Sequence, residues 1–152
     1  MLSSVDILRQ TRKNLINKVN SLSDEQLLAV PEGMNNNILW NVAHLQVTLK
    51  LLIYKLSGLE TGLDEQYINM LRKGSSPEDW NGFVPDIEKV KEALIADVDQ
   101  LEKDIEAGIF ENYNEYPTSF GVTLSSIEDA INFNTNHENI HLGVILAMAH
   151  LV

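Results

Sequence analysis

Residues 37–56 read NILWNVAHLQVTLKLLIYKL, and apolar side chains occur on almost every side of this segment when it is wound as a helix. A helix that is apolar all round is buried among other elements, so the segment predicts a helix in the middle of a bundle. His44 lies in its central part, on one stripe with Trp40, Asn41 and Thr48. A polar side chain in such a position needs a partner.

Three further long segments have apolar residues at helical spacing, and none of the four long segments contains a proline. No segment has a convincing strand pattern, internal repeat or low-complexity composition. The sequence therefore predicts an all-α protein, a four-helix bundle with long connections after the second and third helices, in which side chains projecting inward build the functional sites. The predicted long helices span residues 4–20, 37–56, 86–107 and a last segment from Thr123 or Ser125 to about His150, with short helices at 23–31 and 64–72.

Length and composition restrict the class of protein. A chain of 152 residues with 44% hydrophobic content predicts a single domain over residues 1–152. The 22 acidic and 11 basic residues give a net charge of −11, which disfavours nucleic acid and anionic lipid as partners. The start of the chain lacks the pattern of a signal peptide, and polar residues interrupt the apolar run of 38–56, so we expect a cytoplasmic protein without a membrane segment.

Near the end of the chain, residues 134–143 read NTNHENIHLG and place His137 and His141 four positions apart. Two such side chains stand on one helix face, one turn apart, and both can reach one metal ion. Because the chain has no cysteine, a metal must be held by His, Asp or Glu. Together with His44 the pair would give three ligands and leave one position for water or substrate. The alternative is that His44 is a core histidine with a protein partner and that the spacing of His137 and His141 arose by chance. His150 lies nine positions after His141, about half a turn away on the helical wheel, and is predicted to lie on the surface.

The letters HENIH also have the His-Glu-x-x-His pattern of zinc proteases, which require a third ligand downstream. No Asp or Glu follows His141, and Val144 and Ala147 stand where the extended protease motif needs Gly and His. The sequence therefore disfavours a peptidase. Glu138 remains a candidate base for metal-bound water or a partner of a metal ligand, with a solvated or inter-helix carboxylate as the alternative.

Other polar and aromatic residues are candidates for supporting roles. Asn41 and Asn134 each stand three positions before a histidine and could accept a hydrogen bond from an imidazole. Gly143, inside a predicted helix, is expected to permit close approach of a neighbouring helix. Four aromatic residues either line a pocket or belong to the core: Trp40, Trp80, Phe120 and Phe133.

The first helix differs in charge from the rest of the chain. Residues 1–23 carry a net charge of +3, whereas residues 24–152 carry −14. This pattern predicts either a solvated face that pairs with acidic neighbours or a cationic wall for an anionic ligand.

Residues 37–45, NILWNVAHL, followed by residues 137–143, HENIHLG, resemble the DinB/YfiT-like superfamily of metal-binding four-helix bundles, which includes bacillithiol transferases and mycothiol-dependent maleylpyruvate isomerases. The resemblance extends over the whole chain in helix order and length. It implies a divalent metal, often zinc or nickel, held by His44, His137 and His141, and it implies a homodimer. Val144 departs from the family, where glutamine often follows the glycine.

The characterised relatives imply chemistry in which the open metal position takes the thiolate of a low-molecular-weight thiol and presents it to an electrophile. In this chain Arg9, Arg12 and Lys13 are candidates to hold the anionic part of such a thiol. Two other classes stay open: a metal-binding or small-ligand-sensing bundle without turnover, and a purely structural interaction bundle. An enzyme should have an open metal position in a pocket that reaches solvent.

Overall fold

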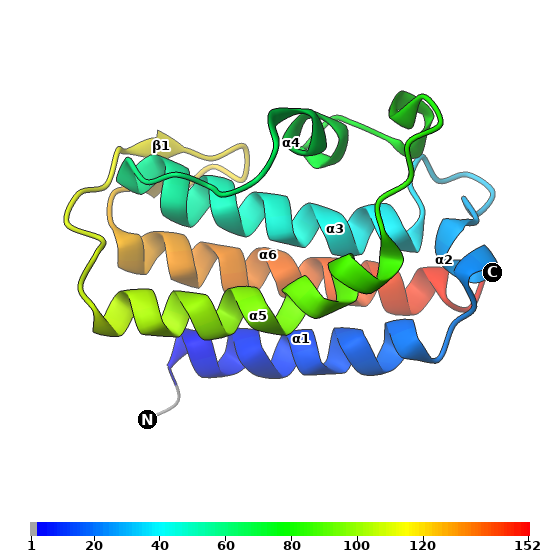
Figure 1. The fold of residues 1–152 in the computed structure, drawn as a ribbon, viewed down its shortest axis with the longest axis horizontal. Helices are drawn as coiled ribbons and strands as arrows, with labels where there is room; N and C mark the ends of the chain where they lie inside the picture. The colour runs from blue at the N-terminus through cyan, green and yellow to red at the C-terminus, as the bar shows by residue number, and fades with distance from the viewer. Residues whose placement is uncertain (1–2) are drawn as a thin grey trace.

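The computed structural model describes residues 3–152, and helices make up most of it (Figure 1). The long helical segments run side by side along the long axis of the molecule (Figure 1). The helix α1 contacts α5 and α6, and α3 contacts the same two helices. The predicted helical fold class is therefore confirmed. The long segments are α1 (Ser4–Asn20), α3 (Ile38–Leu49), α5 (Ile87–Glu106) and α6 (Ile127–Met148).

Short elements fill the connections. The helix α2 (Asp24–Leu28) follows α1, while α4 (Glu65–Leu71) and the 3-10 turn η3 (Pro77–Trp80) lie between α3 and α5. The connection from α5 to α6 contains two antiparallel strands, β1 (Tyr116–Pro117) and β2 (Thr123–Leu124). The sequence prediction missed this strand pair, because two residues are too few to show an alternating pattern.

A side-chain cap fixes the start of α3, and with it the position of His44. Asn37 Oδ1 accepts a hydrogen bond from the Trp40 backbone N–H at 2.7 Å, and Asn37 Nδ2 donates to the Leu28 carbonyl at 3.1 Å. The asparagine therefore satisfies a free helix donor and ties the helix start to α2.

The second long segment is not one regular helix, although residues 37–56 were predicted as such. After Leu49 it continues as the π-helix η1 (Lys50–Tyr54) and the 3-10 turn η2 (Lys55–Ser57), and it ends at Gly58 with a φ of 76°. Lys50 Nζ lies 3.3 Å from Asp97 Oδ1 and 4.4 Å from the centre of the Tyr54 ring. Wide π-turns of this kind occur often at functional sites, and here the turn lies beside the pocket described below.

The interior is formed by two apolar clusters. The first includes Leu39 and Leu45 of α3 together with Leu94, and the second includes Leu8, Ile53 and Leu101. Ten of the residues of α3 are buried, as the apolar sequence of this helix predicts. Within residues 3–152, none of the helices combines the length and apolar character that crossing a membrane requires.

Candidate metal centre

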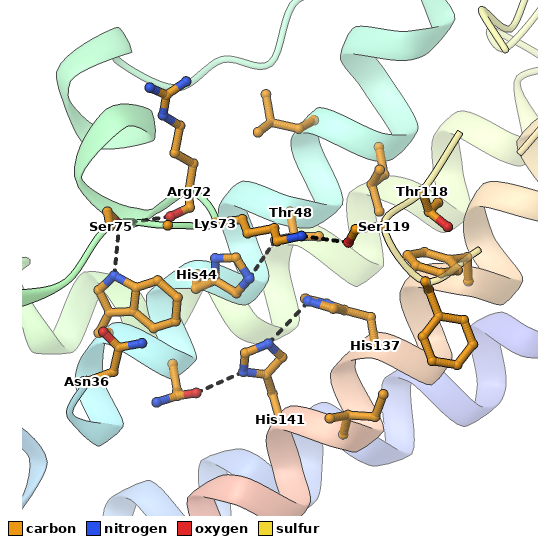
Figure 2. A pocket seen from close by; sticks show the side chains of 18 of the residues that line it. Asn36, His44, Thr48, Arg72, Lys73, Ser75, Thr118, Ser119, His137 and His141 are labelled. Atoms are coloured by element: carbon orange, nitrogen blue, oxygen red, sulfur yellow. Dashed lines mark hydrogen bonds between the residues drawn. The ribbon is translucent and has the colours of Figure 1, made fainter. Parts of the chain in front are cut away.

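The structure brings His44 of α3 together with His137 and His141 of α6, as Figure 2 shows. One ring nitrogen from each of the three lies within 4.8 Å of the others. The ring centres are 5.3 Å apart for His44 and His137, 4.9 Å for His44 and His141, and 4.5 Å for the pair on α6. The three imidazoles therefore form one group that could hold a metal ion.

Hydrogen bonds orient two of the rings. His44 Nδ1 lies 2.6 Å from the Leu71 carbonyl oxygen, so Nδ1 must carry the proton and donate it, which leaves a lone pair on Nε2. His141 Nδ1 lies 2.8 Å from Asn41 Oδ1. The Asn41 amide is itself oriented, because its Nδ2 donates to the Asn37 carbonyl at 2.8 Å. His141 is thus also held with its Nε2 free to act as a ligand.

The separation of the two donor atoms on α6 is close to that in a metal site. His137 Nε2 and His141 Nε2 lie 3.1 Å apart. Two nitrogens that each bind a tetrahedral zinc at 2.0–2.1 Å should lie about 3.3 Å apart. The hydroxyl of Thr48 lies 3.1 Å from His44 Nε2, beside the same nitrogen that would bind the ion. His137 Nδ1 is buried and has no hydrogen-bond partner among the described residues.

Burial keeps these imidazoles neutral. Removal from water lowers the pKa of His44 and of His137 to about 4, and it lowers the pKa of His141 to about 3. The neutral imidazole is the form that binds a metal, so the three side chains are ready for coordination at neutral pH without releasing protons.

The two asparagines have different partners from those that the sequence suggested. Asn41 accepts a hydrogen bond from His141 of the facing helix rather than from His44 of its own helix. Asn134 Nδ2 donates to Glu138 Oε1 at 2.9 Å and does not contact a histidine. Asn41 lies on the side of the histidines, whereas Asn134 faces the ion pair of Glu138 and Arg12, because packing between helices selects the partner.

Glu138 is fully buried and faces α1. Its carboxylate accepts two hydrogen bonds from Arg12, from Nε at 2.9 Å and from Nη2 at 2.7 Å. It does not line the pocket over the histidines. The predicted role as a base for metal-bound water does not fit this position, because the arginine occupies both carboxylate oxygens. The structure shows the alternative that the sequence left open, in which the Glu138 carboxylate joins two helices, here α6 and α1.

The cations of α1 are not brought to the histidines either. Arg9 pairs with Asp99 and, at 2.8 Å, with Glu102, both on α5. Arg12 is buried against Glu138 and donates to the Leu94 carbonyl at 3.0 Å, while Lys13 is exposed. None of Arg9, Arg12 and Lys13 lines the pocket, so their predicted contact with an anionic ligand beside the metal is not supported by this geometry. Arg9 and Arg12 instead form ion pairs with acidic neighbours, which is the other role that the sequence predicted for the cations of this helix.

A large pocket of about 1680 Å³ opens over the three histidines. Its walls come from α3 and η1, the segment after α4, the β1–β2 hairpin and α6. Of the four aromatic residues named above, Trp40, Phe120 and Phe133 line it, whereas Trp80 is buried in the core. The Trp40 ring stacks on His44 with centres 4.6 Å apart, which positions that imidazole at the bottom of an accessible pocket.

Sequence reasoning missed three cations that do line the pocket, namely Lys55, Arg72 and Lys73. Lys55 and Arg72 lie at the ends of the predicted helices 37–56 and 64–72, and Lys73 follows in the irregular connection, so a helical pattern does not assign their direction. The adjacent basic pair Arg72-Lys73 before Gly74 is the signal that could have indicated them.

Two smaller predictions have opposite outcomes. His150 is exposed beyond the end of α6, as expected. Gly143 does not permit a close helix contact, because a Cβ placed there would meet nothing within 4 Å. It lies on the exposed side of α6, so close packing does not explain a glycine at this position.

Comparison with known proteins places these features in a family. The family model of the DinB superfamily matches residues 7–145, a range that includes all three histidines, the helix α3 and most of α6. No curated protein matches the chain.

Proposed function

Since the chain belongs to the DinB superfamily, we propose that His44, His137 and His141 hold a divalent metal, zinc or nickel, in a four-helix bundle of the DinB/YfiT-like type. The observation that carries this proposal is the convergence of three neutral imidazoles at the base of a pocket. Three protein ligands are the number that catalytic zinc sites use, with one position left for water or substrate.

We further propose a metal-dependent enzyme that transfers a low-molecular-weight thiol to an electrophilic small molecule. A metal bound by three histidines would lower the pKa of a thiol ligand and favour the nucleophilic thiolate near neutral pH. In the reaction, the thiol proton leaves to solvent, the sulfur forms a bond to the electrophilic carbon, and the leaving group departs with its electron pair. The protein supplies fixed imidazoles, oriented by Leu71 and Asn41, and walls that hold both reactants.

The size of the pocket supports two substrates. Sites for one small ligand usually enclose about 300–1,000 Å³. The pocket here has about 1680 Å³, so a thiol and an electrophile have room side by side. A hydrolase would need room for only one organic substrate and a water molecule.

A second candidate is a bundle that binds a metal or small ligand and senses it without turnover. One observation favours it: within residues 3–152, Glu78 is the only carboxylate that lines the pocket, and Glu138 is occupied by Arg12. The site therefore lacks a free carboxylate base next to the histidines. A thiol transferase can work without such a base because the metal itself would acidify the thiol.

Metal analysis of the purified protein is the first test, with His44→Ala and the matched variant His150→Ala beside it. We expect about one equivalent of metal in the wild type and in His150→Ala, and a large loss in His44→Ala. Full metal content in His44→Ala would contradict the three-histidine site. The second test measures consumption of 1-chloro-2,4-dinitrobenzene with a panel of low-molecular-weight thiols by the metal-loaded protein. Metal without thiol-dependent turnover would favour the sensing alternative.

We also propose the homodimer that membership of the family suggests. The exposed side of α6 carries Ile140, Gly143, Val144 and Ala147 without a charged side chain, and the side chains of Ile140 and Val144 are 58% and 38% exposed. Such a surface suits contact with a second copy of the chain.

A further inference from the structure

The pocket is cationic although the protein is acidic. The chain has a net charge of −11 and twice as many carboxylates as cations. Among the pocket-lining residues this ratio is inverted, with Lys55, Arg72 and Lys73 against the single carboxylate of Glu78. A concentration of one sign of charge in a cleft attracts ligands of the opposite sign.

The three pocket cations have no carboxylate partner. None of Lys55, Arg72 and Lys73 forms an ion pair within the part of the chain that the structure describes. Carboxylates do pair with cations elsewhere in the same residues, at Arg9, Arg12, Lys50 and Lys91. The charge of the pocket is therefore not neutralised by the protein itself.

Lys73 is held in place by a neutral group. Its ammonium Nζ donates to Ser119 Oγ at 2.6 Å, a contact between the segment after α4 and the turn between β1 and β2. Figure 2 shows the lysine side chain extending across the pocket toward Ser119, on the same side as His44 and Thr48. An ammonium group has three donors, and the serine uses one of them. The lysine is thus positioned, charged and still able to donate to ligand oxygens.

The remaining walls suit an apolar body. Leu51, Leu52 and Phe133 line the same pocket as Lys73, and so does Phe120, whose side chain is 73% exposed at the entrance. A pocket with apolar walls and a few placed polar groups binds ligands whose apolar part fills the space and whose polar part is fixed by those groups.

We propose that the ligand of this pocket has an apolar or aromatic body and an anionic group, a carboxylate or a phosphate, that Lys73 binds, while Arg72 and Lys55 add attraction at longer range. Binding of the anion at Lys73 would direct the other end of the ligand toward the histidines. This inference names the substrate class for the pocket of the proposed function. It depends on that pocket and not on the presence of the metal.

Binding of 2-naphthoate, 2-naphthyl phosphate and the neutral 2-naphthamide to the purified protein tests the proposal by calorimetry. The three probes share the aromatic body and differ in charge. We expect the wild type to bind at least one anion about fivefold or more tightly than the amide, and this preference should weaken as the salt concentration rises. The anion that binds more tightly identifies the group as carboxylate or phosphate.

Two variants assign the effect to the lysine. Lys73→Gln should bind the anions nearly as weakly as the amide, while Lys89→Gln, which removes the same charge from the exposed start of α5, should keep the wild-type preference. Equal binding of the amide and both anions by the wild type would overturn the proposal, and so would an unchanged preference in Lys73→Gln. Metal content measured on the same samples distinguishes the anion site at Lys73 from the metal site at the three histidines. If the protein contains no metal but still binds the anions more tightly than the amide, and Lys73→Gln removes this difference, the anion site is upheld and the metal site is contradicted.

Discussion

The side chain of Asn41 on α3 accepts a hydrogen bond from His141 on α6, with 2.8 Å between Asn41 Oδ1 and His141 Nδ1. The helix that supplies one histidine therefore also orients a histidine of the opposite helix. Because the same asparagine donates to the backbone of Asn37, the orientation of the His141 ring depends on the start of α3. The two helices thus position the metal ligands jointly.

Replacement of Asn41 should weaken metal binding. In Asn41→Ala the His141 ring loses its acceptor, and we expect a metal affinity about 10- to 100-fold lower, measured by competition with a chromogenic chelator. Asn41→Asp keeps an acceptor and should stay close to the wild type or bind more tightly. Asn14→Ala, an exposed change on α1, is the control. An unaltered affinity in Asn41→Ala would show that this hydrogen bond has no part in holding the ligand.

The ion pair of Arg12 and Glu138 should determine stability rather than chemistry. Both side chains are fully buried, so removing Arg12 leaves Glu138 charged without its ion-pair partner, and removing Glu138 leaves Arg12 with only Asp97, 3.9 Å away. We expect Glu138→Gln and Arg12→Met each to lower the free energy of unfolding by about 3–5 kcal/mol in urea denaturation. The double variant Arg12→Met/Glu138→Leu should recover much of that loss, since no charge remains unpaired.

A catalytic role of Glu138 predicts a different result from the same variants. If the carboxylate took part in the reaction, the stable double variant would keep its metal and lose its turnover. We expect it instead to retain both, because Glu138 lies outside the pocket.

The metal-free protein should lose stability in mild acid. Burial lowers the pKa of His44 and His137 to about 4 and that of His141 to about 3, while an unfolded chain titrates near the ordinary value of 6.5. Below pH 6.5 the unfolded state therefore binds more protons, and the free energy of unfolding should fall as the pH drops from 6.5 toward 4. Each unit of pKa difference corresponds to about 1.4 kcal/mol.

Urea denaturation in the presence of a chelator, between pH 7.5 and 4.5, measures this dependence. The variant His141→Gln lacks one of the buried titrating groups and should lose less stability over the same range. A loss as steep as that of the wild type would assign the pH dependence to other groups.

The proposed homodimer should depend on the exposed side of α6. Val144→Glu introduces a charge there, and we expect sedimentation velocity to show a shift from dimer to monomer. Ile109 has a similar exposed fraction, 37% against 38% for Val144, and lies outside α6, so Ile109→Glu is the matched control. A wild-type monomer at micromolar concentration would contradict the dimer.

The sequence by itself determined the helical class and the helices that carry the three histidines. Apolar spacing is a local property, and the long segments are regular enough to show it. It also disfavoured a protease, since the required ligands are missing after His141. The spacing of His137 and His141 placed both on one face of α6, and the apolar surroundings of His44 indicated that its helix lies inside the molecule.

Tertiary structure decided which side chains meet. Periodicity assigns a residue to a helix face but does not identify the element that packs against that face. For this reason Glu138 faces Arg12 rather than the metal site, and Asn41 contacts His141 rather than His44. The pocket cation Lys73 comes from an irregular segment, where no periodic pattern assigns a direction, and its contact with Ser119 joins residues 46 positions apart. Only the packing of the chain brings such pairs together.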